Sequence, residues 1–372
     1  MFGRCFVNIA IFTRNLSHVM GGMERQLLSI ASGYCDRGHK VLVVSLDAKP
    51  GETFFASDPR ILFVGINIGI ASRKATFKER FRRQVYVYKF LGSEKIDVSI
   101  AFMTGSFWYS AIPSRLKGKP IVLAERNGPT IYKRTRVRKF NWLIFASMLM
   151  ASSITVQFAS YIKSYPTYLR SRIIVIPNQI PIFENLRRET SSEFRFIFAG
   201  RLSNQKQINE LVQAFIQFHA KNLNTRLDIF GDGEQKNNVL DLINKGKAEK
   251  YIFLHPPTKI IQEALAHADV MVAPSLWEGF PNSVAEALAY GVPVGGFDDC
   301  EGVRDLIVSG KNGWLISRRD SLRSQVELLE TIYRERNQLS RFSVEAVKSV
   351  LEYQGEAPNH CWEKLTRNLT AL

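Results

Sequence analysis

Short apolar runs rich in β-branched residues alternate with amphipathic segments along nearly all of this 372-residue chain. A strand that is apolar throughout is typical of a sheet covered on both faces, and helices between such strands make the sheet parallel. The alternation therefore predicts a succession of βα units and excludes fibrous and disordered classes. In the first half we expect strands at residues 6–12, 40–45, 61–64, 98–102, 121–125, 154–157 and 173–176, with helices such as 23–35 and 77–91 between them.

Pro177 and Pro181 interrupt this alternation, and the polar stretch 184–193 that follows is typical of a linker. The pattern resumes with strands expected at 195–199, 226–230, 252–254, 270–273 and 292–295, and helices at 208–219, 234–245, 259–267 and 283–290. We therefore predict an α/β protein with two Rossmann-like domains, residues 1–180 and 181–345, and a C-terminal helix within 346–372 that packs back towards the first domain. Two such domains facing each other across a cleft would bind a ligand at the carboxyl ends of their strands.

The charge of the chain is concentrated in its first half. The formal net charge is +16. Residues 1–180 hold 27 Lys and Arg against 9 Asp and Glu, whereas residues 181–372 hold 23 against 25. The first domain should therefore bind an anionic partner, which could be nucleic acid, an anionic membrane surface or a phosphorylated acceptor.

The cysteines and the longest uncharged stretch indicate in which cellular compartment the chain works and whether this stretch crosses a membrane. Cys5, Cys35, Cys300 and Cys361 form no C-x-x-C pair, which argues against a zinc site or a disulfide framework and suits a reducing cytosol. Residues 140–162 carry no charge and are long enough to span a membrane. Polar side chains interrupt the stretch, so we predict a helix ending near Ala151 and then a strand.

The strongest local pattern is E-G-F-P-N-S-V-A-E at residues 278–286. Glu278 follows a predicted strand, Ser283 is placed at the start of a helix, and Glu286 falls one turn into it. The amino end of a helix favours an anion, and a carboxylate can accept hydrogen bonds from two sugar hydroxyls. An alternative is that Glu286 only complements the helix dipole and that Glu278 is solvated.

A second pattern follows the first predicted strand of the second domain. That strand ends at Gly200, and Arg201 and Lys206 come directly after it. Two cations at the carboxyl end of a strand are placed to bind a diphosphate. Taken alone, the pattern also fits two solvated surface cations.

These motifs together resemble glycosyltransferase family 4, whose members are retaining enzymes of the GT-B fold, and among them the bacterial enzymes of O-antigen, capsule and exopolysaccharide synthesis. The resemblance covers nearly the whole chain. It rests on G-R-L-x-x-Q-K at 200–206, E-G-F-P-N-x-x-x-E-A at 278–287, G-V-P-V at 291–294, F-G-D-G at 230–233, G-K-N-G at 310–313, G-G-M-E at 21–24 and V-I-P-N at 175–178.

The resemblance implies a donor site built from both domains. Arg201 and Lys206 would bind the donor diphosphate, Glu286 the ribose hydroxyls and Glu278 the donor sugar. Glycine in the first domain would let its loop approach the donor without a side chain in the way. The remaining donor-binding residues implied by the family are Gly21, Gly22, Phe280, Pro281, Asn282 and Ser283.

The segment E-R-N-G at 125–128 departs from the E-H-N of many family members. Arg126 replaces a histidine that lies near the reacting sugar, and an arginine cannot act as a base at neutral pH. The resemblance implies that Arg126 stabilises phosphate charge or binds the acceptor together with Glu125 and Asn127. An alternative is that Arg126 simply pairs with Glu125 or another neighbour.

No metal-ligand cluster is apparent in the sequence, so we expect a metal-independent enzyme without a cofactor beyond its nucleotide-sugar substrate. Arg201 and Lys206 would then stabilise the departing nucleotide diphosphate in place of a metal ion. Together with Arg126 and Glu278 they are the expected catalytic residues. The resemblance also implies retention of configuration, with the diphosphate leaving from the face that the acceptor attacks.

Two basic clusters favour a membrane partner. One extends from Arg73 to Lys89, and the other, from Lys133 to Lys139, leads into the aromatic segment 140–145. Basic residues beside an aromatic helix are typical of a helix lying on an anionic membrane. We expect a cytoplasmic enzyme bound peripherally to the inner face of the cytoplasmic membrane, with a polyprenyl-diphosphate-linked glycan as acceptor. A solvated basic face over a buried helix is the alternative.

The sequence thus predicts a retaining transferase that moves a hexose or N-acetylhexosamine from a nucleotide-sugar, with UDP favoured, to a lipid-linked glycan. A related GT-B enzyme, such as a sugar-nucleotide epimerase or a small-acceptor synthase, is one alternative. A nucleic-acid-binding protein is another, suggested only by the charge of the first half, because no nucleic-acid-binding module is recognised.

Overall fold

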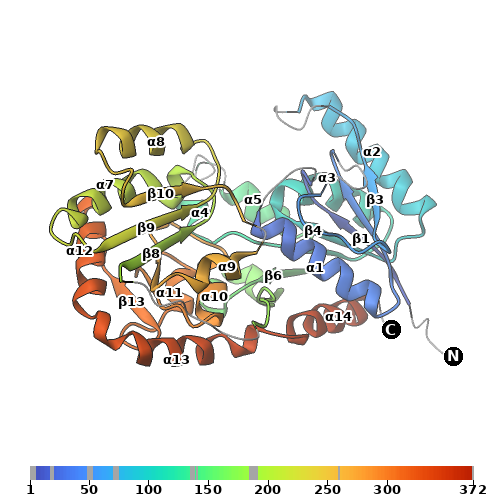
Figure 1. The fold of residues 1–372 in the computed structure, drawn as a ribbon. Helices are drawn as coiled ribbons and strands as arrows, with labels where there is room; N and C mark the ends of the chain where they lie inside the picture. The colour runs from blue at the N-terminus through green and yellow to red at the C-terminus, as the bar shows by residue number, and fades with distance from the viewer. Residues whose placement is uncertain are drawn as a thin grey trace. The chain divides into compact units, whose positions relative to one another are not determined.

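The computed structural model describes residues 6–16, 21–47, 53–69, 75–134, 139, 141–183, 192–258 and 260–370. These residues form two compact units (Figure 1). The first runs to Gln179 and resumes at Glu356, and the second is Ile180–Gly355. The second unit thus includes residues 346–355, which the sequence pattern groups with the C-terminal helix. Most of the predicted linker, residues 184–191, lies outside the described ranges.

The first unit is built on a seven-stranded sheet in the order β3-β2-β1-β4-β5-β6-β7, and all its pairs are parallel. The parallel α/β architecture predicted from the apolar runs is therefore confirmed. β1 is the strand at which the order reverses, so the carboxyl ends of β1 and β4 form the switch point. The strands are β1 Asn8–Phe12, β2 Lys40–Ser45, β3 Leu62–Gly65, β4 Val98–Phe102, β5 Ile121–Ala124, β6 Ser153–Val156 and β7 Ile173–Val175.

Helices cover both faces of this sheet. Because parallel crossovers are right-handed, reversing the strand order moves the connecting helices to the opposite face. α1 (Gly22–Asp36) and the C-terminal α14 (Ala357–Thr370) cover one face. The crossovers that lead to β4, β5 and β6 contain α2 (Phe77–Ser93), α3 (Met103–Leu116) and α5 (Asn141–Met148), which lie on the other face. Shorter helices complete the unit, namely α4 Ile131–Arg134, α6 Thr167–Arg170 and the 3-10 helix Ala159–Ser164.

The uncharged stretch 140–162 folds as predicted, with α5 ending at Met148 and strand β6 following it. Among the described residues, no helix combines the length and the hydropathy needed to cross a membrane. Parts of the two basic clusters fall outside the described ranges, namely Arg73, Lys74, Arg136, Arg138 and the adjacent Phe140.

α14 closes the apolar face beneath β1 and β4. Its Trp362 is 1% exposed and stacks on Phe102 with ring centroids 6.5 Å apart. Leu365 joins the same core as β1, β2 and α1. The chain therefore leaves the first unit at Gln179 and returns to it to complete the core.

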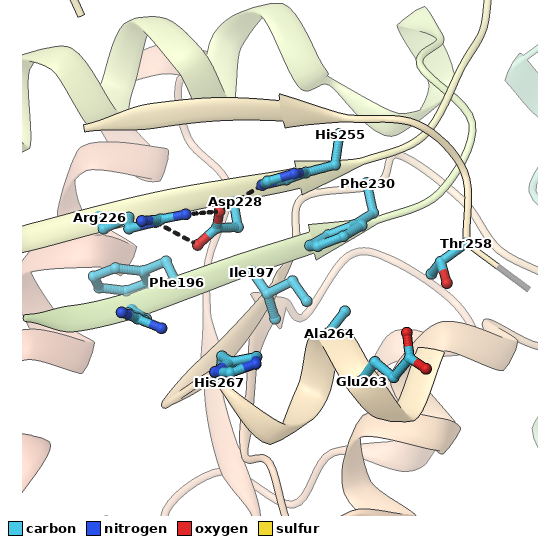
Figure 2. Close-up of a pocket in the computed structure, with 12 residues that line it drawn as sticks. Phe196, Ile197, Arg226, Asp228, Phe230, His255, Thr258, Glu263, Ala264 and His267 are labelled. Carbon is cyan, nitrogen blue, oxygen red and sulfur yellow. Dashed lines mark hydrogen bonds and ion pairs between the residues drawn. The ribbon is translucent and has the colours of Figure 1, made fainter. Parts of the chain in front are cut away.

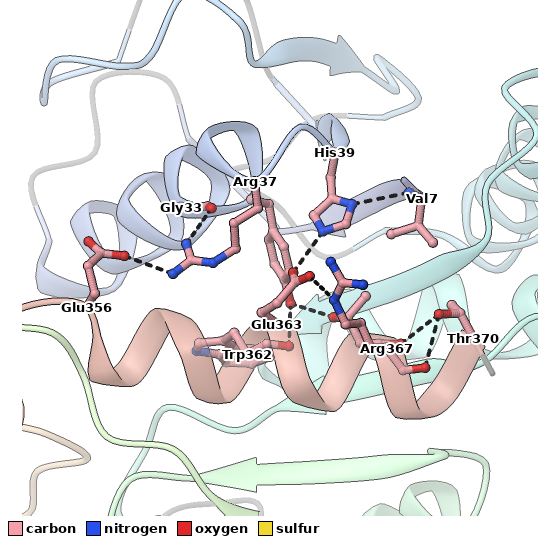
Figure 3. Close-up of polar contacts among 11 residues, drawn as sticks. Val7, Gly33, Arg37, His39, Glu356, Trp362, Glu363, Arg367 and Thr370 are labelled. Atoms are coloured by element: carbon pink, nitrogen blue, oxygen red, sulfur yellow. Dashed lines mark hydrogen bonds and ion pairs between the residues drawn. The ribbon is translucent and has the colours of Figure 1, made fainter. Parts of the chain in front are cut away.

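Polar contacts fix α14 against α1 and the turn before β2 (Figure 3). His39 Nδ1 accepts the N–H of Val7 at 3.2 Å, which leaves Nε2 to donate to Glu363 Oε2 at 2.8 Å. Glu363 also accepts a hydrogen bond from Arg367. Tyr34 donates from its hydroxyl to the carbonyl of Trp362 at 3.1 Å. Buried polar groups are thus satisfied at the seam between the helix and the sheet.

The second unit contains a six-stranded parallel sheet in the order β10-β9-β8-β11-β12-β13. β12 begins at Val294, two residues after its predicted start, because Pro293 has no N–H to give to the ladder and only its carbonyl bonds, to Met271. β13 is not among the predicted strands. The strands are β8 Phe194–Ala199, β9 Thr225–Phe230, β10 Ile252–His255, β11 Val270–Ala273, β12 Val294–Phe297 and β13 Gly313–Ile316.

An aromatic core holds the helices of the second unit to its sheet. Phe196 of β8 meets Phe215 and Phe218 edge-on, with centroids 5.6 Å apart in both pairs. All three rings are fully buried. The helices are α7 Ile208–His219, α8 Lys236–Lys245, α9 Ile261–Ala266, α10 Asn282–Ala289, α11 Val303–Leu306, α12 Ser321–Arg334 and α13 Leu339–Ser349.

The position of Trp362 generates a stability prediction. Trp362→Ala should lower the free energy of unfolding by about 3–5 kcal/mol, because it removes a large buried ring and leaves a cavity. Urea titration followed by far-UV circular dichroism measures this. Trp142→Ala is the matched control, since Trp142 is 66% exposed and its loss should cost about 0.5 kcal/mol or less. Equal effects of the two substitutions would contradict the packing of α14 described above.

Candidate functional site

Two loops meet at the carboxyl ends of β8 and β11, which are neighbours in the second sheet. The N–H of Leu276 donates to the carbonyl of Gln205 at 2.9 Å. Gln205 Nε2 in turn donates to the carbonyl of Trp277 at 2.7 Å. The loop that carries Arg201 and Lys206 is therefore bonded to the loop that carries Glu278.

Lys206 and Glu278 form an ion pair where these loops meet. Lys206 Nζ lies 2.6 Å from Glu278 Oε1, and the two side chains are 17% and 10% exposed. Neither group is a solvated surface charge, so the solvated alternative is wrong for both. Arg201, in contrast, is exposed.

The second part of the E-x7-E motif enters α10. This helix begins at Asn282, which places Ser283 in its first turn as predicted. Asn282 and Ser283 are half-buried, whereas Phe280, Pro281 and Glu286 are buried. Glu286 is only 4% exposed, so a carboxylate is held inside the unit one turn from the helix start. A carboxylate buried at this position favours the binding of a polar group over the alternative that Glu286 only complements the helix dipole.

Glycine is required where the loops after β8 and β9 cross. A Cβ on Gly231 would lie 2.0 Å from the carbonyl oxygen of Gly200, and one on Gly233 would lie 2.4 Å from that of Leu202. The N–H of Leu202 donates to the carbonyl of Asp232 at 2.9 Å. The F-G-D-G motif is thus explained by backbone packing that supports the loop of Arg201 and Lys206.

Arg318 supports the loops of the site through hydrogen bonds, and it is not among the predicted site residues. Its guanidinium donates to the carbonyls of Pro274 at 3.0 Å and Ser275 at 2.7 Å, and to Gln207 Oε1 at 2.8 Å. It also pairs with Asp299 at 3.1 Å. Arg318 follows β13, and because that strand was not predicted the sequence offered no reason to place this side chain near the other strand ends.

In the first unit, Glu125 supports the turn after β5. Glu125 is 1% exposed, and its Oε1 accepts the N–H groups of Arg126 at 3.0 Å and Asn127 at 3.2 Å. Its Oε2 accepts a hydrogen bond from the Tyr132 hydroxyl. Burial raises the pKa of Glu125, and these hydrogen bonds oppose that rise. Asn127 is half-buried beside it.

The guanidinium of Arg126 bonds neighbours other than Glu125, so the alternative of pairing with a neighbour stays open. Its guanidinium donates to Asn178 Oδ1 at 3.1 Å and to Thr155 Oγ1 at 3.3 Å, which are neutral acceptors. The guanidinium carbon lies 5.4 Å from the ring centre of Phe102 and 5.2 Å from that of Trp362. Burial lowers the pKa of Arg126 to about 10, so it stays charged at neutral pH. The first unit thus holds a buried cation near the carboxyl ends of its central strands.

The glycine pair begins α1. Gly21 is the residue before the helix and Gly22 is its first residue. A Cβ on Gly21 would lie 2.1 Å from Glu24 Oε2, so the carboxylate folds back over this position. Gly21 and Gly22 therefore lie in the first unit with Glu125, Arg126 and Asn127, whereas the remaining predicted site residues lie in the second unit.

A separate pocket of about 410 Å³ lies between the second sheet and α9 (Figure 2). Arg226, Asp228 and His255 meet within it, with His255 Nε2 2.6 Å from Asp228 Oδ1 and Arg226 Nη2 2.8 Å from the same oxygen. Asp228 raises the pKa of Arg226 through this contact. No predicted site residue lines the pocket. Within the described ranges, His, Cys, Asp and Glu side chains nowhere gather in threes to hold a metal ion.

Comparison with known proteins agrees with this arrangement. The family model described as Glycosyltransferase Family 4 matches residues 20–182, and that described as Glycosyl transferases group 1 matches residues 182–349. An uncharacterized glycosyltransferase of Methanocaldococcus jannaschii is 33% identical over 157 residues, which are 39% of this chain. The GtfA subunit of a UDP-N-acetylglucosamine–peptide N-acetylglucosaminyltransferase of Streptococcus pneumoniae is 29% identical over 199 residues, or 53% of this chain. These matches span only 39% and 38% of the two relatives.

Solved structures match the whole fold. TarM superimposes with a TM-score of 0.79 at 15% identity, over 97% of this chain and 98% of its own. The pneumococcal O-GlcNAc transferase GtfA, in complex with UDP and GlcNAc, superimposes with a TM-score of 0.77 at 15% identity, over 98% and 99%. Since the two domain models match consecutive halves of the chain and both parallel-sheet units match GT-B structures, the chain belongs to glycosyltransferase family 4 and has the GT-B fold.

Proposed function

We propose that this glycosyltransferase transfers a hexose or N-acetylhexosamine from a UDP-sugar to a lipid-linked glycan, with retention of configuration, at the inner face of the cytoplasmic membrane. The observation that carries the donor half of this proposal is the Lys206–Glu278 ion pair, held where two strand-end loops are bonded together. The complex of pneumococcal GtfA with UDP and GlcNAc supports the choice of UDP.

The donor site acts through charge and position. Exposed Arg201 and half-buried Lys206 are placed on one loop, and both would bind the diphosphate as it leaves. A cation in a partly desolvated site stabilises developing phosphate charge more strongly than it would in water. Glu278 holds the ammonium of Lys206 in place, and its carboxylate would contact the donor sugar. Glu286 would take the ribose hydroxyls in the same way.

We assign the making and breaking of bonds to the two substrates, and the stabilisation of charge to side chains of the protein. The bond between the anomeric carbon and the diphosphate oxygen breaks, the acceptor oxygen bonds to the same face of that carbon, and its proton passes to the departing phosphate. Arg126 remains protonated at neutral pH and cannot act as the base. It serves as a fixed positive charge of the first unit, and no metal ion is needed in this scheme.

The acceptor assignment rests on charge. The excess of Lys and Arg in residues 1–180 suits an anionic acceptor and the anionic surface that carries it. A polyprenyl diphosphate supplies both a diphosphate for the cations and an anchor in the membrane.

Nucleotide binding tests the donor assignment. UDP at about 100 times its dissociation constant should stabilise the protein by about 2.7 kcal/mol, which raises the melting temperature measurably. Arg201→Ala and Glu286→Gln should abolish most of this shift, because each removes a partner of the nucleotide. Arg334→Ala, an exposed arginine of the same unit, is the control and should leave the shift unchanged. A shift with GDP alone would replace UDP in the proposal, and the absence of a shift with UDP, GDP and ADP would contradict the donor site.

Catalysis tests the role of Lys206. Lys206→Met should lower kcat by about 10²–10³-fold, the range found when one preorganised charge-stabilising group is removed. Release of UDP from a panel of UDP-sugars in the presence of membrane extract measures the rate. Lys236→Met is the control, because Lys236 pairs with Asp232 at the surface and is 45% exposed. A fall in kcat of less than about tenfold would remove Lys206 from the catalytic group.

A further inference from the structure

Two helices of the first unit carry apolar side chains on their outer faces. Phe77, Phe81, Val85 and Tyr88 of α2 are 86%, 62%, 39% and 39% exposed. Their spacing puts them on one side of the helix, opposite the buried Arg83, Val87 and Phe90. Exposure of this kind along a whole helix face is unusual in a soluble monomer.

α3 repeats the arrangement. Trp108, Ile112 and Leu116 recur every four residues and are 49%, 41% and 71% exposed. α5 adds Trp142 at 66% and Leu143 at 46%. The basic cluster beside residues 140–145 was evident in the sequence. The apolar stripe on α3 was not, because it joins a larger surface only through the packing of α3 between α2 and α5.

Three contacts join these helices side by side. Gln84 Nε2 donates to the carbonyl of Trp108 at 3.5 Å, and Lys117 Nζ lies 4.1 Å from the ring centre of Tyr88, so α2 borders α3. Trp108 Nε1 donates to Ser147 Oγ at 3.2 Å, so α3 borders α5. The stripes therefore belong to one surface of the unit. We name it the apolar ridge, and it consists of Phe77, Phe81, Val85, Tyr88, Trp108, Ile112, Leu116, Trp142 and Leu143.

The charges around the apolar ridge are almost all positive. Exposed Lys78, Arg80, Arg82 and Lys89 lie on α2, and exposed Arg115 lies on α3. Glu79 is the only acidic residue in α2, α3 and α5, and it is engaged in the capping box with Thr76. Aromatic rings flanked by Lys and Arg on a helix surface match the headgroup boundary of an anionic bilayer.

We propose that the apolar ridge is a membrane-docking surface that inserts its aromatic and aliphatic side chains into the headgroup region of an anionic lipid bilayer. The proposal deepens the proposed function and rests on it, since a membrane-bound acceptor requires the enzyme to work at that surface. A second copy of the chain fits poorly, because a symmetric contact would set one basic surface against another.

Vesicle flotation of the full chain tests the ridge. The wild type should float with phosphatidylglycerol–phosphatidylcholine vesicles and much less with phosphatidylcholine alone. Replacing three ridge residues, in Phe81→Ser/Trp108→Ser/Leu116→Ser, should reduce the floated fraction by about tenfold or more. The control Leu223→Ser/Val308→Ser/Val344→Ser removes equally exposed apolar residues from the second unit and should float as the wild type does. Arg82→Glu/Lys89→Glu should remove the preference for anionic vesicles.

The outcomes separate this inference from the proposed function. Flotation of the triple ridge variant at the wild-type level would overturn the inference. So would a wild-type dimer, seen by sedimentation velocity, that the ridge variant converts to a monomer. The UDP-induced rise in melting temperature is measured on every variant, which also shows that each is folded. A retained UDP shift without vesicle binding refutes the ridge alone, whereas ridge-dependent flotation without any UDP shift refutes the donor assignment alone.

Discussion

Burial of both faces of each parallel sheet is the constraint on which this protein depends. Every residue of β4 and β11 is buried, so these central strands leave no face for ionisable side chains. At the centre of each sheet charged groups are therefore confined to the strand ends and to the loops that leave them, whereas Arg226 and Asp228 lie within β9, one strand from the sheet edge. The Lys206–Glu278 pair and the buried Arg126 both lie in such places. The same packing that stabilises the sheets thus determines where charge can be held.

The second unit shows how much support a small charged site requires. Lys206 and Glu278 come from different loops, and their approach depends on backbone contacts between those loops. Gly231 lets the loop after β9 pack closely against the start of the Lys206 loop, since any side chain there would strike Gly200. Arg318 then donates to the carbonyls of Pro274 and Ser275, directly after β11. In the proposed function, this preorganisation holds the charges in position before the substrate arrives, which is where electrostatic catalysis gains most.

The first unit depends on the last part of the chain. α14 returns after Gly355 and places Trp362 over Phe102 and beside Arg126. A buried guanidinium is costly in isolation, and the aromatic rings and neutral acceptors around Arg126 reduce that cost. The C-terminal helix is therefore part of the environment of a proposed active-site residue as well as part of the core.

The sequence by itself determined most of the elements, though not β13, and the chemistry of the motifs. The limits of β2, β4, β11 and α7 agree with those predicted, because each is an apolar or amphipathic run that begins directly after a polar residue. The motifs that contain Arg201, Lys206, Glu278 and Glu286 were also evident, as was the family. Only the tertiary structure decided the strand order, the rings and acceptors that surround Arg126, the hydrogen bonds of Arg318 to the strand-end loops, and the continuity of the apolar ridge. Each of these joins segments far apart in the chain, and local periodicity carries no information about which distant segments will pack together.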